Sequence, residues 1–221
     1  MPAVSPASIL LVVMAVASAT VHLHAEYRGP RWLVYLMKPL TTALLVGAAA
    51  SAQAADPLYR WAILVGLGFS LAGDVFLMLP GDRFVAGLAS FLAAHIAYLT
   101  AFSLGVGFGS RPVLLLPYAT AAIAVLWLLW PRLGSLRVPV VIYVAALVAM
   151  AWQATTRAAA GHTELAAAAA AGATLFVVSD ASLAINRFRG SFRAAQVLVM
   201  STYVAAQALI ALSVSQTAGY H

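Results

Sequence analysis

Two aspartates lie inside apolar runs of this sequence, Asp74 in SLAGDVFLML and Asp180 in VVSDASLAINRF. A carboxylate at bilayer depth costs roughly 2.5 to 3.5 kcal/mol on insertion scales, so a chain rarely keeps one there without a use for it. One lysine, Lys38 in RWLVYLMKPL, lies in a third apolar run. Two neighbouring carboxyl groups in a low-dielectric pocket do not both ionise easily, so such a pair can supply one acid and one carboxylate. These residue types indicate acid–base chemistry, and the alternative is a structural ion pair with Lys38 or a hydrogen bond between helices.

Further polar side chains occur in two other apolar runs. His95 and Tyr98 lie in FLAAHIAYLTAF, whereas Tyr203 and Gln207 lie in TYVAAQALI. We expect these four side chains to bind substrate oxygens or to position water. Hydrogen bonds between helices use the same residue types and are the alternative.

A metal site is not expected. The chain has no cysteine, and its histidines lack a His-x-x-x-His or similar helical spacing. The same absence of cysteine excludes disulfides and thiol nucleophiles. We expect no metal and no other cofactor.

Composition identifies the class of protein. Of the 221 residues, 64% are apolar and 8% are charged, and the mean hydropathy is +0.97. Soluble domains are roughly half apolar and a quarter charged, so this is a polytopic membrane protein. Too little charge remains to solvate a separate globular domain, and we expect one membrane domain over residues 1–221. The net charge of +6 comes from scattered basic residues, which are typical of topology signals and not of nucleic-acid binding.

Eight segments are long and apolar enough to cross about 30 Å of hydrocarbon as helices. They lie at residues 6–25, 33–53, 58–80, 84–107, 112–130, 138–156, 164–186 and 194–215. No Lys or Arg precedes the first segment, so we interpret it as a helix and not as a signal peptide. The expected fold is an all-α bundle of eight transmembrane helices.

The basic residues predict the orientation of the bundle. Nine of the twelve fall on the side of the first, third, fifth and seventh connections: Arg28, Arg31, Lys38, Arg83, Arg132, Arg137, Arg187, Arg189 and Arg193. Arg60, Arg111 and Arg157 fall on the opposite side. Because basic loops stay in the cytoplasm, both termini should lie on the noncytoplasmic side. The expected location of the protein is a membrane such as the bacterial inner membrane.

The orientation places the charged residues in depth. Asp74 and Asp180 each lie about six residues before the cytoplasmic end of their segment, roughly 9 Å deep at 1.5 Å per residue. Lys38 lies at a similar depth near the start of its segment. Ionisable groups in a membrane face one another or a wet cavity. We therefore expect a polar pocket open toward the inner leaflet, with the two carboxyl groups within about 10 Å of each other.

A short internal similarity relates the two aspartate segments. GDVFL in the third segment resembles SDASL in the seventh, and four segments separate them. The pattern suggests a parallel repeat of four plus four helices. The alanine-rich tract at 164–174 predicts close helix packing, because small residues let backbones approach in lipid.

An ordered set of motifs over nearly the whole chain resembles the lysoplasmalogenase (YhhN) family of eight-span membrane proteins. The motifs are EYRGPRW, KPLTT, GDVFLMLP, FLAAHIAYLTAF, SDASLAINRF and TYVAAQALI. The resemblance implies hydrolysis of the vinyl ether bond of lysoplasmalogens, which gives a fatty aldehyde and glycerophosphoethanolamine or glycerophosphocholine. It also implies a lysophospholipid substrate and membrane lipids as surroundings. The scattered basic residues already indicate no nucleic acid partner. The family's polar motifs fall on Lys38, Asp74, His95, Tyr98, Asp180, Tyr203 and Gln207.

This reaction suits the residues independently of the resemblance. A vinyl ether is protonated at its β-carbon to an oxocarbenium ion, which water captures, and glycosidases stabilise a similar state with paired carboxyl groups. The sequence does not decide which aspartate donates the proton. We favour Asp74 as the donor and Asp180 as the base that orients water or stabilises the ion. Lys38 could hold the lipid phosphate or bias the protonation of the pair.

Two other functions use the same residues. A proton-coupled transporter would use membrane carboxylates and a lysine as its relay. The absence of clear broken helices and of an inverted repeat disfavours this alternative. A noncatalytic lipid-binding protein is the second alternative.

Overall fold

The computed structural model describes residues 4–54, 56–161 and 165–215, and every regular element in these ranges is helical. The α-helices of the described residues are α1 (Pro6–Arg28), α2 (Arg31–Ala50), α3 (Pro57–Met78), α4 (Phe84–Ser103), α5 (Leu116–Leu129), α6 (Arg137–Ala159), α7 (Ala166–Phe188) and α8 (Ala195–Leu212). Short 3-10 turns flank α5: η1 (Pro112–Leu115), η2 (Trp130–Arg132) and η3 (Gly134–Leu136). Eight helical segments of this described part are long and apolar enough to cross a membrane. The prediction of an all-α bundle with eight spans is confirmed.

Helix ends differ from the expected boundaries by a few residues. Apolarity alone does not determine where a helix ends, because capping and turn residues also contribute. Ser5 caps α1 by accepting a hydrogen bond from the Ser8 amide, and Asp56 caps α3 in the same way. A difference of four residues occurs at the end of the fourth span, expected at 107 and found at Ser103. Gly105 follows with a φ of 70°, a left-handed conformation that glycine adopts readily. The expected first residue of the seventh span, Glu164, lies outside the described residues.

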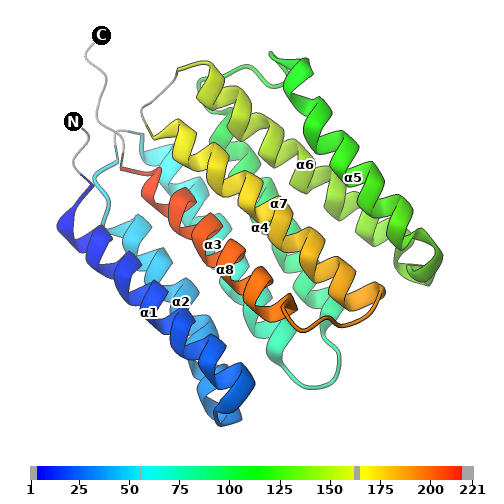
Figure 1. The fold of residues 1–221 in the computed structure, drawn as a ribbon. Helices are drawn as coiled ribbons and strands as arrows, with labels where there is room; N and C mark the ends of the chain where they lie inside the picture. The colour runs from blue at the N-terminus through cyan, green and yellow to red at the C-terminus, as the bar shows by residue number, and fades with distance from the viewer. Residues whose placement is uncertain (1–3, 55, 162–164, 216–221) are drawn as a thin grey trace.

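Seven helices contact one another in a closed cycle. α1 packs on α2, α2 on α3, α3 on α4, α4 on α6, α6 on α7, α7 on α8, and α8 returns to α1. α8 also contacts α2 across the cycle, whereas α5 packs on α6 and α7 from outside. In Figure 1, α5 lies at one edge of the bundle beside α6, and α1 and α2 lie at the other edge. Large apolar side chains on the outer faces, such as Trp127 (78% exposed), face the lipid expected around a membrane bundle.

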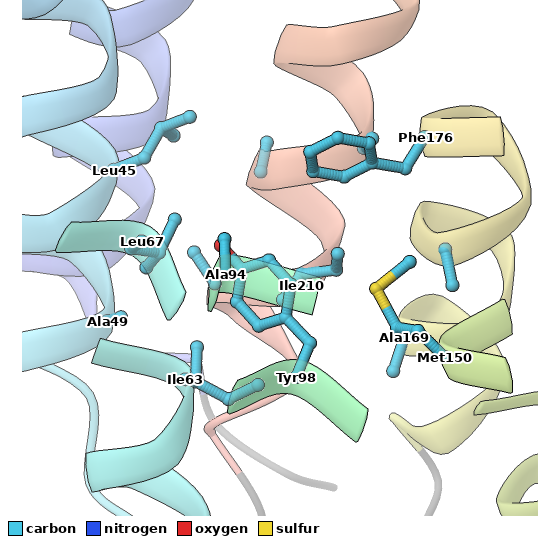
Figure 2. Close-up of a cluster of buried hydrophobic side chains, with 14 of the residues drawn as sticks. Leu45, Ala49, Ile63, Leu67, Ala94, Tyr98, Met150, Ala169, Phe176 and Ile210 are labelled. Carbon is cyan, nitrogen blue, oxygen red and sulfur yellow. The ribbon is translucent and has the colours of Figure 1, made fainter. Parts of the chain in front are cut away.

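Small residues allow the helices of the cycle to approach closely. A Cβ atom added to Gly172 of α7 would lie 2.7 Å from the backbone oxygen of Ala206 in α8. The buried cluster of Figure 2 likewise interleaves Ala49, Ala94 and Ala169 with larger side chains such as Tyr98 and Phe176. Packing of small against large residues therefore brings α7 and α8 into close contact.

The contacts between the two halves support a parallel repeat. Shifting by four helices relates α2 to α6 and α8 to α4. The contact of α2 with α8 then corresponds to the contact of α6 with α4, and both contacts occur. The two aspartate helices, α3 and α7, occupy equivalent positions in this scheme.

Candidate active site

A polar cavity of about 950 Å³ opens at the end of the bundle where α1 joins α2, α3 joins α4 and α7 joins α8. Asp74 and Asp180 both line it, together with Lys38 and Tyr203. The cavity therefore contains the two aspartates, the lysine and one of the tyrosines singled out in the sequence. His95, Tyr98 and Gln207 are buried and do not line it.

Asp74 is held by three donors from two neighbouring helices. Oδ2 accepts hydrogen bonds from the Thr42 hydroxyl at 2.6 Å and the Tyr203 hydroxyl at 2.7 Å. Oδ1 lies 3.8 Å from the Lys38 ammonium nitrogen. The residue itself is only 2% exposed. Two hydroxyl donors and one cation are a set of partners suited to a carboxylate that carries its charge.

Asp180 has different partners, from α6 and α4. The Tyr143 hydroxyl donates to Oδ2 at 2.5 Å, and His95 Nε2 lies 3.7 Å from the same oxygen. The His95 ring is fully buried and makes T-shaped contacts with the rings of Tyr143 and Phe176. Among the described residues, no lysine or arginine pairs with Asp180. Asp180 therefore lies beside a hydroxyl and an imidazole, whereas Asp74 lies beside an ammonium group.

The partners of the two aspartates correspond under the four-helix shift. Asp74 on α3 is contacted from α2 and α8, whereas Asp180 on α7 is contacted from α6 and α4. The four-helix shift therefore relates two carboxyl groups that have unlike partners. One carboxyl lies beside a lysine and the other lies beside a histidine.

Tyr98 and Gln207 form a second polar layer below the cavity. The Tyr98 hydroxyl donates to Gln207 Oε1 at 2.7 Å, and its ring packs against Phe176. Phe176 also contacts the Tyr203 and His95 rings. Substrate binding by Tyr98 and Gln207 stays a prediction, and their contacts support a role in positioning α4 against α8.

The two aspartates lie at different distances from the ends of their helices. Asp74 lies four residues before the end of α3 at Met78, and Asp180 lies eight residues before the end of α7 at Phe188. The sequence suggested about six in both cases. The difference arises because α3 ends two residues before the expected boundary and α7 ends two residues after it. The two aspartates line the same cavity nonetheless.

Two partners of the aspartates were not anticipated from the sequence. Thr42 lies four residues after Lys38, so the two share a helix face, and this spacing in KPLTT was an available signal. Tyr143 lies within VVIYVAALV, where nothing polar adjoins it in the sequence. Its only signal is that a buried tyrosine hydroxyl usually finds a partner.

The mouth of the cavity carries charges of both signs. Its cationic side chains include Arg31, Arg83 and Arg187, and its acidic ones include Glu26 and Asp82. Arg187 pairs with Asp82 at 2.6 Å. No group of three or more potential metal ligands is found among the described residues.

The fold and this cavity define a multi-pass membrane protein whose polar site combines two carboxyl groups with a lysine. The chain belongs to the YhhN family, whose model matches residues 33–214. It is 30% identical to the "Uncharacterized membrane protein YhhN" of Escherichia coli O6:H1 over 89% of this chain and 94% of that protein. It is 36% identical to "Lysoplasmalogenase TMEM86B" of Sus scrofa over 85% of this chain and 78% of that protein. Identity to "Lysoplasmalogenase TMEM86A" of Homo sapiens is 38% over 68% of this chain and 64% of that protein. No solved structure gives a significant match.

Proposed function

We propose that this protein is a membrane hydrolase that cleaves the vinyl ether bond of lysoplasmalogens. The products are a fatty aldehyde and glycerophosphoethanolamine or glycerophosphocholine. Relatives named lysoplasmalogenase, at 36% and 38% identity, support the reaction class. The observation that carries the proposal is that Asp74 and Asp180 line one polar cavity with unlike partners.

The reaction needs an acid and a water-directing base at one place. An acid protonates the β-carbon of the vinyl ether, and the resulting oxocarbenium ion carries its charge on the carbon and oxygen of the former ether. Water adds to that carbon and gives up a proton, forming a hemiacetal. The hemiacetal then collapses to the aldehyde and the free glycerol hydroxyl. One proton is consumed and one is returned, so no cofactor is required.

The contacts of the two aspartates favour Asp180 as the proton donor and Asp74 as the carboxylate, the reverse of the preference drawn from the sequence. Asp74 faces the Lys38 ammonium and two hydroxyl donors, all of which stabilise negative charge. Asp180 has no such cation among its described partners. Tyr143 donates to Asp180 and can stabilise the anion that remains after proton transfer. Asp74 can then orient water or stabilise the oxocarbenium ion.

The mouth of the cavity suits a zwitterionic head group. Arginines of α2 and of the α3–α4 connection, Arg31 and Arg83, can bind a phosphate, and Glu26 can receive an ammonium group. Lys38 lies deeper, beside Asp74, and can contact the glycerophosphate while it holds Asp74 in its charged state. His95 and Tyr203 act through the aspartates that they contact.

The decisive experiment is aldehyde release by the purified protein in detergent. We expect release from a lysoplasmalogen and none from the matched lysolipid with a saturated alkyl ether, because the latter has no vinyl carbon to protonate. In heavy water the aldehyde should carry deuterium on the carbon next to the carbonyl. Absence of aldehyde from a folded protein would contradict the proposal, and lipid or solute uptake into proteoliposomes without turnover would favour a carrier.

A further inference from the structure

An apolar groove lies beside the polar cavity, between α5 and the helices α4, α6 and α7. Its described lining carries two polar side-chain groups, the Tyr143 hydroxyl and the Asp180 carboxyl, and is otherwise apolar. These two are hydrogen-bonded to each other. A polar occupant of such a groove would leave its own polar groups unpaired, so the groove suits a hydrocarbon.

The groove and the polar cavity share one wall. Five residues line both: Leu77, Phe84, Phe91, Asp180 and Leu183. Asp180 is the ionisable group on this shared wall, whereas Asp74 and Lys38 line the polar cavity alone. The two compartments therefore meet at one of the two candidate catalytic carboxyl groups.

We propose that the groove binds the hydrocarbon chain of the lysolipid substrate, with the head group in the polar cavity and the bond to be cleaved at the shared wall. This inference rests on the proposed function and names the subsite for the chain. A lysolipid has one polar end and one apolar chain, and it matches two compartments of these characters joined side by side. A soluble substrate would leave the groove without a use.

The position of Asp180 agrees with the direction of proton delivery. The β-carbon of a vinyl ether lies on the chain side of the ether oxygen. A lipid bound across the shared wall places this carbon toward the groove, where Asp180 lies, and its glycerol oxygens toward Asp74. The assignment of Asp180 as donor thus follows from the two compartments as well as from its partners.

Helix α5 forms the outer wall of the groove and is weakly embedded. Of its described residues, Leu129 alone is buried. Ala122 lines the groove, whereas Ala124 on the same helix is exposed and lines neither compartment. The two alanines offer a matched pair of positions, one inside the proposed chain site and one outside it.

Filling the groove should change selectivity for chain length. Ala122→Trp should lower kcat/KM for a hexadecenyl lysolipid by roughly tenfold or more, as expected when two or more buried methylene groups are displaced. Turnover of an octenyl lysolipid should stay within about twofold of wild type, because its chain loses few of these contacts. Ala124→Trp should leave both rates unchanged. An unaltered chain-length profile in folded Ala122→Trp would overturn the proposal.

A binding experiment on the unmodified protein keeps the chain site testable if Ala122→Trp does not fold or if no hydrolysis occurs. The probe is a nonhydrolysable alkyl ether lysophosphoethanolamine with a diazirine at the chain end, and peptide mass spectrometry locates its adducts. Adducts on the groove faces of α5 and α6, reduced by excess unlabelled lysolipid, are expected. If these adducts form but the wild-type protein hydrolyses no lysoplasmalogen, the proposed function is refuted and the chain-binding site is supported. Hydrolysis with adducts elsewhere, or groove adducts that excess lysolipid does not reduce, would refute the chain site.

Discussion

Asp74 and Asp180 carry the same functional group in different surroundings, and the difference lies in the residues that reach them. Asp74 receives a lysine and two hydroxyls, whereas Asp180 receives a tyrosine and a buried histidine. A carboxyl beside a cation keeps its charge more easily than one without it. The unlike partners are the basis of the unlike roles that we propose for the two groups.

Replacing either aspartate by asparagine should abolish most activity and preserve the fold. The amide keeps the size of the side chain and much of its hydrogen bonding but cannot donate an acid proton or carry charge. For Asp180→Asn we expect a loss of roughly 10²- to 10⁴-fold, the usual contribution of general acid catalysis. Asp74→Asn should also be severely impaired. Aldehyde release and size-exclusion profiles in detergent measure the two properties.

The matched control for these variants is Asp56→Asn. Asp56 caps α3 at the opposite end of the bundle, and asparagine caps helices equally well. It should retain wild-type turnover. Near wild-type rates in folded Asp74→Asn and Asp180→Asn would show that both aspartates are structural.

Tyr143→Phe removes the hydroxyl that donates to Asp180. A hydrogen bond to a charged group is worth about 1.5 to 3 kcal/mol, so kcat should fall by roughly tenfold or more if Tyr143 stabilises the anion left by proton transfer. The KM should change little, because the contact matters most in the transition state. Tyr118→Phe is the control, since the Tyr118 hydroxyl joins α5 to Thr155 and Thr174 away from the cavity. Equal losses in the two variants would indicate a general packing effect.

At the scale of the helices, the α7–α8 contact determines the position of Asp180. Gly172 lies two turns before Asp180 on α7, and its backbone rests against α8. The α3–α4 contact does the same for Asp74, because Gly73 packs against the ring of Phe91. Each aspartate thus lies on a helix that small residues hold close to its neighbour.

Gly172→Ala should therefore destabilise the protein. The added methyl group would lie 2.7 Å from the Ala206 oxygen, and overpacking of this kind typically costs about 1 to 3 kcal/mol. Gly68→Ala is the matched control, because an added Cβ there meets no atom within 4 Å and alanine favours a helix. Thermal unfolding in detergent should show a lower midpoint for Gly172→Ala and an equal or higher one for Gly68→Ala. The reverse order would contradict the role assigned to close packing.

For the whole molecule, we propose that the cavity opens to the cytoplasm, because most basic residues lie at its end of the bundle. The chain has no cysteine, so single cysteines can report which side each end faces. Ser191→Cys lies in the connection of α7 to α8 at the cavity end, and Ser110→Cys lies before η1 at the other end. Both serines are exposed.

A membrane-impermeant maleimide added to intact cells should label Ser110→Cys. Ser191→Cys should react only after the membrane is permeabilised. The opposite labelling pattern would invert the orientation and place the cavity at the outer leaflet.

The sequence by itself determined the membrane class, the eight spans and the candidate carboxyl groups. Apolar length decides which segments cross a bilayer, and a charge inside such a segment is costly enough to reveal a functional group. Thr42 could have been inferred as well, because four residues on a helix place it on the face of Lys38. These properties depend on local composition and helical period, which a single segment contains.

The tertiary structure alone decided which partners each aspartate has and which compartments they border. Tyr143 and Asp180 are 37 residues apart, and Asp74 and Tyr203 are 129 apart. No periodicity in either segment encodes these contacts, because the rotation and level of one helix against another depend on the packing of small residues along the whole interface. The same packing places α5 outside the cycle of helices and leaves the apolar groove beside Asp180. The proposed division of roles between the two aspartates therefore rests on contacts that only the folded bundle creates.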